Sequence, residues 1–200
     1  MSMHKLTTII VLGIVAATSV AAPPTPVPRK APEFSFFNPS GKAIALSNFK
    51  GKVVVMEFLF IGSMHCVRVA QILNKLNGEL GPRGLQPVAI AFSAPHSEAN
   101  QATVDSFAQS YNLAFPVGYT SKDSVDRFLG RSDKEMLAIP QVVVIDRGGM
   151  IRAQTGQQYN PLLEDEGSLR TLLDNLLKEN PPADSPAKTA PPAPTKKTRH

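Results

Sequence analysis

Residues 52–60 limit how this chain can fold more strongly than any other segment. They read Lys-Val-Val-Val-Met-Glu-Phe-Leu-Phe, a nearly continuous apolar run interrupted by Glu57. A run that is rich in β-branched and aromatic residues is typical of a strand buried on both faces of a sheet. Other elements must then cover both faces, so the sequence predicts a layered α/β protein.

A helix is expected directly after this strand, with Ser63 as its N-cap. Apolar residues recur there at spacings of three and four, which defines one face of an amphipathic helix, and serine is a favoured N-cap residue. The apolar positions are Val67, Ala70, Leu73, Leu76 and Leu80. Similar patterns predict strands at 87–93, 115–119, 141–146 and 150–154 and helices at 98–111, 124–129 and 169–177. This order implies a central mixed β-sheet with helices on both faces.

The N-terminus has the pattern of a secretory signal peptide over residues 1–21. Lys5 precedes an apolar run, and small residues lead up to Ala21, where a signal peptidase could cut. An uncleaved anchor is the alternative, but the run is shorter than the roughly 20 residues that a membrane span needs. We therefore expect a periplasmic or secreted protein with no stable membrane anchor after cleavage.

Two proline-rich segments flank the folded region. We expect residues 22–32 to be an extended, solvated linker and residues 180–200 to be a disordered Pro/Ala/Lys tail, which leaves residues 33–179 as one domain. The whole chain has a net charge of +5, and all of this excess lies at the ends, because residues 33–179 sum to −1. The folded domain is therefore not expected to bind nucleic acid. The basic tail is interpreted as a solvated segment, with contact to an anionic surface as the alternative.

Several segments of the chain resemble the TlpA-like branch of the thioredoxin superfamily, which is grouped with the AhpC/TSA (redoxin) proteins. The likeness extends from about residue 31 to residue 177. It is carried by Ala-Pro-Glu-Phe-Ser-Phe at 31–36, Leu-Ser-Asn-Phe-Lys-Gly-Lys-Val-Val-Val at 46–55, Ala-Ile-Pro-Gln at 138–141 and Val-Ile-Asp-Arg-Gly-Gly-Met-Ile at 144–151. The resemblance implies a thioredoxin-like fold with a helix-strand insert at 98–119. It also implies thiol oxidoreductase activity toward a protein or peptide thiol or disulfide, without a cofactor.

The resemblance places three functional positions besides the cysteine. Pro140, after Ile139, falls where the family has a cis-proline beside an extended substrate; an ordinary trans proline is the alternative. Glu57 falls where many thioredoxins have a buried acid that could exchange a proton with Cys66. A crevice glutamate in contact with water is equally consistent with the sequence. The family's Cys-x-x-Cys motif maps onto residues 63–66, so Ser63 replaces the attacking cysteine.

Cys66 is the only cysteine of the chain, so no internal disulfide can form. A serine hydroxyl cannot form a mixed disulfide, and we do not expect the two-cysteine cycle. At most, Cys66 could act alone as a redox thiol, with Ser63 orienting a peroxide and with the helix dipole and His65 favouring the thiolate. An ordinary peroxiredoxin is not expected, because Leu59 and Pro140 stand where that group has proline and arginine.

Two further hypotheses remain open. The first is a redox-inactive binding module that uses the groove beside Pro140, with Cys66 as a small buried residue. The residues around the motif favour this hypothesis slightly over catalysis, whereas the family resemblance favours an oxidoreductase. The second is a copper site at Met64, His65 and Cys66. Adjacent helical residues diverge and His96 is distant along the chain, so we expect no metal.

Overall fold

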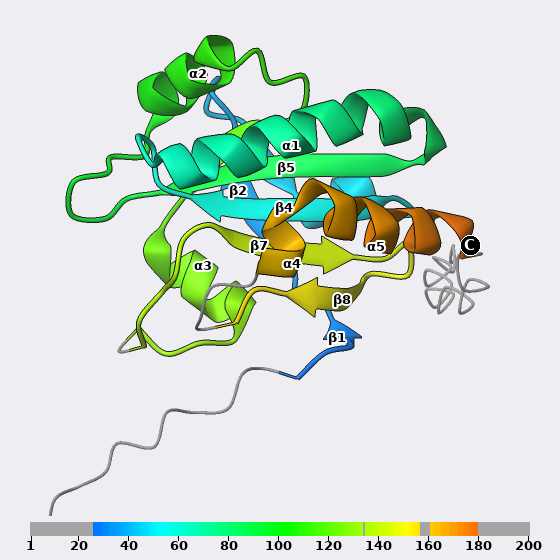
Figure 1. Cartoon of the computed structure of the whole chain (residues 1–200). Coiled ribbons are helices and arrows are strands. Elements are labelled where there is room, and N and C mark those ends of the chain that lie inside the picture. The colour runs from blue at the N-terminus through cyan, green and yellow to red at the C-terminus, as the bar shows by residue number, and fades with distance from the viewer. Residues whose placement is uncertain (1–25, 134, 157–160, 180–200) are drawn as a thin grey trace, which may run out of the picture.

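Strand β4 (Val53–Leu59) lies at the centre of the fold, where the apolar run predicts it. All seven of its residues are buried. In the computed structural model it pairs in parallel with β5 (Leu85–Phe92) and antiparallel with β7 (Gln141–Ile145), so the sheet is mixed (Figure 1). The prediction of a buried central strand is confirmed.

Eight strands form the sheet among the described residues, in the order β1-β8-β7-β4-β5-β6-β2-β3. The predicted strand at 150–154 coincides with β8, and the one predicted at 115–119 corresponds to β6, which begins two residues later and ends one residue later. Three short strands were not predicted, because runs of two or three residues carry no readable alternation. The remaining strands are β1 (Arg29–Lys30), β2 (Ser35–Phe37), β3 (Ala43–Ala45), β6 (Val117–Thr120) and β8 (Met150–Gln154).

The main helix α1 (Met64–Leu80) begins where the spacing of apolar residues predicts it. Ser63 is its N-cap, and its Oγ accepts a hydrogen bond from the backbone N–H of Cys66 at 3.4 Å. The other helices are α2 (Gln101–Ser110), α3 (Lys122–Leu129), α4 (Pro161–Glu164) and α5 (Glu166–Lys178), with short 3₁₀ turns at Leu46–Phe49 and Gly81–Arg83. Of these, α4 was not expected from the sequence.

The two faces of the sheet are covered by different helices. Side chains of α1, α2 and α5 pack on one face together with Val53, Val55 and Leu59 of β4. Side chains of α3 pack on the other face together with alternate residues of β4, such as Met56 and Phe58. Figure 1 shows α1 and α5 side by side across one face. The prediction of an α/β fold with helices on both faces is confirmed.

The structure describes residues 26–133, 135–156 and 161–179. The expected signal peptide, the first part of the linker and the expected tail lie outside these residues. Within them, none of the helices is long and apolar enough to cross a membrane.

The expected linker is not solvated throughout. Arg29 and Lys30 form the edge strand β1 against β8. The guanidinium of Arg29 donates hydrogen bonds to the carbonyl of Phe128 and to Oε1 of Gln154, at 3.1 and 2.7 Å. Prolines exclude a central strand but permit an edge strand, which explains why composition alone misjudged this segment.

Candidate functional site

The candidate site lies where the chain leaves β4 and enters α1. Gly62 has a φ of +89°, which allows the sharp turn between strand and helix. Ser63 then caps α1, and Cys66 follows in the first helical turn. The residues that the sequence predicts as a motif are therefore placed at the end of the central strand.

Cys66 is completely buried and belongs to the hydrophobic cluster between the sheet and α1. The pKa of its thiol is raised to about 11, chiefly because the side chain is buried. The hydrogen bond with Ser63 is the largest opposing effect, the charges of Glu57 and Glu164 add to the rise, and the backbone of Phe60 opposes it. At neutral pH only about one molecule in ten thousand would carry a thiolate. A thiolate is therefore not favoured in this structure, because burial of the thiol is the largest influence on its pKa. The expected influence of His65 and the helix dipole stays a prediction.

Glu57 points to the same face of the sheet and is also completely buried. Neither of its carboxyl oxygens has a hydrogen-bond partner among the described residues. Burial, and then the charge of Glu164, raise the pKa of this carboxyl well above its ordinary value. Of the two alternatives for Glu57, the crevice glutamate in contact with water is wrong.

Glu164 on α4 is a site residue that the sequence analysis did not identify. Its Oε2 pairs with Nε2 of His65, which lies in the first turn of α1. Burial raises the pKa of Glu164, and His65 and Arg68 oppose this effect. No spacing in the sequence relates residue 164 to residue 65.

The Ile139–Pro140 segment lies beside the end of β4. Gln141 is opposite Phe58 in the sheet, so the two residues before Gln141 are level with the last residues of β4. The Ile139–Pro140 peptide bond is cis, and Ile139 packs against the hydrophobic clusters on both faces. The structure thus brings this predicted position to the same edge as the motif.

The loop before Pro140 is held at both ends by buried polar side chains that the sequence analysis missed. At one end Arg131 pairs with the buried Asp126 and donates a hydrogen bond to the carbonyl of Glu135. At the other end the amide of Gln141 donates to the carbonyls of Ala138 and Gly156, at 2.7 and 3.2 Å. These hydrogen bonds tie the described ends of the loop to α3 and to the segment after β8.

Three exposed apolar side chains lie close in sequence to the site residues. Met64 is 72% exposed and Leu162 is 63% exposed, and they are close in sequence to His65 and Glu164, which form the ion pair. Met136, in the loop that leads to Pro140, is 86% exposed. Methionine is flexible and polarisable, which suits it to contact varied apolar partners.

The geometry gives no support to the copper hypothesis. His65 is directed to Glu164. Among the described residues, no three His, Cys, Asp or Glu side chains are grouped so that they could hold a metal ion.

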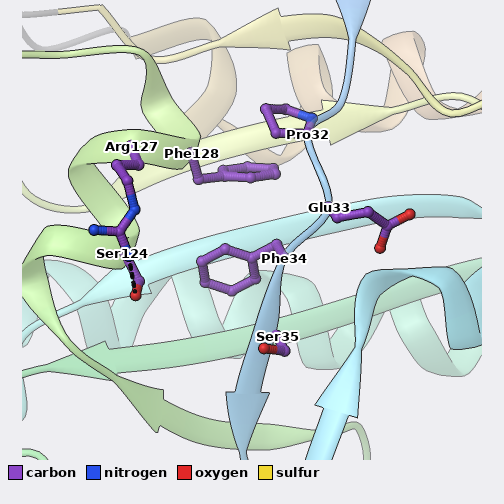
Figure 2. A pocket seen from close by; sticks show the side chains of 7 residues that line it. All are labelled: Pro32, Glu33, Phe34, Ser35, Ser124, Arg127 and Phe128. Carbon is purple, nitrogen blue, oxygen red and sulfur yellow. Dashed lines mark hydrogen bonds between the residues drawn. The ribbon is translucent and has the colours of Figure 1, made fainter.

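A pocket of about 340 Å³ lies away from these residues, between the segment that enters β2 and helix α3. Figure 2 shows the rings of Phe34 and Phe128 lining it and Arg127 on its α3 side, where the guanidinium donates to Ser124 Oγ at 3.1 Å. Both rings belong to the hydrophobic cluster on the sheet face opposite Cys66. This pocket contains none of the predicted site residues and is not part of the candidate site.

A mixed sheet of this order, with a helix-start motif at the end of the central strand and a proline beside it, defines a thioredoxin-fold protein. The chain belongs to the AhpC/TSA family, whose model matches residues 27–154. It is a member of the thiol-disulfide oxidoreductase-like group of this fold.

Curated relatives and solved structures agree with this assignment. The thioredoxin-like protein YneN of Bacillus subtilis (strain 168) is 27% identical over 124 residues, which is 62% of this chain and 68% of the relative. The thiol-disulfide oxidoreductase ResA of Bacillus thuringiensis subsp. konkukian is 25% identical over 138 residues, 68% of this chain and 74% of the relative. A thiol:disulfide interchange protein of the thioredoxin family from Chlorobium tepidum TLS shares the fold, with a TM-score of 0.61 at 20% identity, over 79% of this chain and 99% of that one.

Proposed function

We propose that this protein is an exported binding module that holds an extended polypeptide segment at the edge formed by Met64, Met136 and Ile139, without exchanging thiols with it. One observation carries the proposal. The only thiol of the site is completely buried and its pKa is raised to about 11, while Ser63 occupies the position of the attacking cysteine.

The chemistry of the two motif positions supports binding without turnover. Disulfide exchange needs an accessible thiolate, and Cys66 offers neither access nor ionisation near neutral pH. The hydroxyl of Ser63 caps α1, where it accepts a hydrogen bond from the backbone N–H of Cys66, and its side-chain partner is the buried thiol of the same residue. A serine without a neighbouring base is a poor nucleophile.

The surface around the motif supports an extended apolar partner. Met64 and Met136 are exposed and Ile139 is half-buried. An extended segment can bind to such an edge by backbone hydrogen bonds while alternate side chains enter apolar contacts. The partner class is thus a protein or peptide, as the family resemblance implies.

Single-thiol redox chemistry through Cys66 is the second candidate, and Glu57 favours it. Its unpaired carboxyl lies close enough to affect the thiol and could accept the thiol proton once Cys66 became accessible. This candidate needs a movement that exposes Cys66, whereas the binding module needs none.

Export is part of the proposal and rests on residues 1–21. Expression of the full chain in a Gram-negative host, with mass analysis of the periplasmic protein, tests it. We expect a mature chain that begins after Ala21 or Ala22. Retention of residues 1–21 in the membrane fraction would contradict cleavage.

Binding is tested with methyl-labelled methionine and a permanently unfolded probe, reduced and carboxymethylated α-lactalbumin. After signal cleavage the mature chain keeps four methionines: Met56, Met64, Met136 and Met150. We expect the NMR signals of Met64 and Met136 to shift on titration, while those of Met56 and Met150 serve as internal controls. Equal shifts at all four, or none at any, would contradict the proposed surface.

Absence of exchange is tested by an insulin-reduction assay with dithiothreitol. We expect wild type to match the protein-free rate. Ser63→Cys restores the two-cysteine motif at the end of the same strand, and we expect it to accelerate reduction at least tenfold. Turnover by wild type would support the second candidate instead.

A further inference from the structure

Helix α4 is a single turn that contributes to the wall around Cys66. Leu163 is buried in the same hydrophobic cluster as the cysteine. Glu164 is buried as well, and its charge is close enough to affect the thiol. A residue in the first turn of a helix is often reached by solvent, and the burial of Cys66 therefore depends on what lies against that turn.

An ion pair, called the tie below, joins α4 to α1. Oε2 of Glu164, with a side chain only 3% exposed, pairs with Nε2 of His65, whose side chain is 42% exposed. On its other side α4 is continuous with α5, where Asp165 accepts a hydrogen bond from the N–H of Ser168 at 2.8 Å. When the pair breaks, the half-exposed His65 can replace its partner with water, whereas the buried Glu164 can do so only if α4 moves outward.

We propose that α4 is a cover over Cys66 that the His65–Glu164 pair holds closed, and that reagents reach the thiol only when this pair opens. The inference deepens the proposed function, since it explains how the same site keeps its thiol unreacted beside a bound partner. It also names the movement that single-thiol chemistry would need. Openings of this kind are local and need far less free energy than global unfolding.

The test is the rate at which N-ethylmaleimide alkylates Cys66 in the folded mature chain at pH 8, followed by intact mass. We expect His65→Gln and Glu164→Gln each to raise the rate at least tenfold. The double variant should be no faster than the faster single variant, because both changes break one tie. Rates unchanged in both single variants would overturn the cover.

A matched control separates the tie from general weakening between α1 and α5. Lys75 on α1 pairs with Glu166 on α5 at 2.8 Å, two residues beyond Glu164. We expect Glu166→Gln to change the alkylation rate less than twofold. An increase as large as that of Glu164→Gln would overturn the assignment of the cover to one pair.

The urea dependence of alkylation distinguishes local opening from unfolding. A local opening exposes little surface, so the wild-type rate should rise only weakly with urea. A rate that rises with the full slope of global unfolding would contradict the cover. A different result would contradict the proposed function and not the cover: formation of a mixed disulfide between oxidised glutathione and the folded wild type in the absence of urea.

Discussion

Cys66 on α1 is completely buried near the carboxyl of Glu57 on β4, and burial, with this carboxyl adding to it, raises the pKa of the thiol to about 11. Between the ordinary pKa near 9 and this value, the folded state holds a proton that the unfolded state releases. Stability therefore falls as pH rises through this window, by about 1.4 kcal/mol per pH unit and about 2–3 kcal/mol in all.

The first prediction follows from this linkage. Cys66→Ala removes the titrating group, so its free energy of unfolding should fall less between pH 8.5 and pH 10.5 than that of wild type. Urea unfolding of both proteins at the two pH values measures the difference. Equal losses in the two proteins would mean that the thiol does not hold its proton in the folded state.

The second prediction concerns the unpaired carboxyl of Glu57. Because burial raises its pKa, the folded state keeps a proton above pH 4.5 that the unfolded state loses, and stability falls as pH rises. Glu57→Gln removes this loss of stability, which amounts to about 1.4 kcal/mol for each pH unit between the pKa of Glu57 in the unfolded state and its raised pKa in the folded state. The variant should be more stable than wild type at pH 7, with a smaller advantage at pH 4.

The exposed Glu33 offers a control for this measurement. Glu33→Gln should change the free energy of unfolding by less than about 0.5 kcal/mol at both pH values. If Glu57→Gln destabilised the protein at pH 7, the ionised carboxyl would have a favourable partner, and the account of this site would be wrong.

The third prediction contrasts two glycines. A Cβ on Gly118 of β6 would lie closer than van der Waals contact to the Phe36 ring and to the backbone oxygen of Phe37. Gly118→Ala should therefore lower the free energy of unfolding by about 1–3 kcal/mol. A Cβ on Gly78, in α1, meets nothing within 4 Å, so Gly78→Ala should raise it by about 0.5–1 kcal/mol.

Thermal unfolding of the two alanine variants checks these opposite signs. Two shifts of the same sign would contradict the packing of β6 against β2. If Gly78→Ala alone lowered the thermal stability, the exposed side of α1 would make a contact that the structure does not show.

The fourth prediction concerns the buried ion pair behind the Pro140 loop. Asp126 pairs with Arg131 and also accepts from Nζ of Lys122 at 2.6 Å. Asp126→Asn leaves the buried guanidinium of Arg131 without a counter-charge and should cost about 3–5 kcal/mol. Arg131→Met should cost less, because Lys122 still neutralises the carboxylate. Urea unfolding ranks the two variants, and the reverse order would contradict this argument.

The central strand, α1 and the hairpin of β7 and β8 could be predicted because each is long enough to show its period. Ser63 could be predicted as an N-cap because capping depends on neighbouring backbone groups alone. The strands β1 to β3 are too short for a period to appear. Arg29 is held by partners almost a hundred or more residues away, which no local pattern contains.

The candidate site was predictable in its residue types but not in its electrostatics. The sequence places Ser63 and Cys66 in one helical turn, yet the burial of the thiol depends on α1, the sheet and α4 together. The pairing of His65 with Glu164 could not be predicted, because Glu164 comes from the far end of the domain. Long-range contacts of this kind are set by the fold and leave no spacing in the sequence.

The most direct test of the account is the ionisation of Cys66 in the folded protein. Thiolate absorbance at 240 nm, after subtraction of the Cys66→Ala variant, can be followed from pH 6 upward while circular dichroism stays native. The account predicts no thiolate signal below pH 9, consistent with a pKa of about 11. A thiolate that appears at or below pH 8 would contradict it and would favour single-thiol redox chemistry through Cys66.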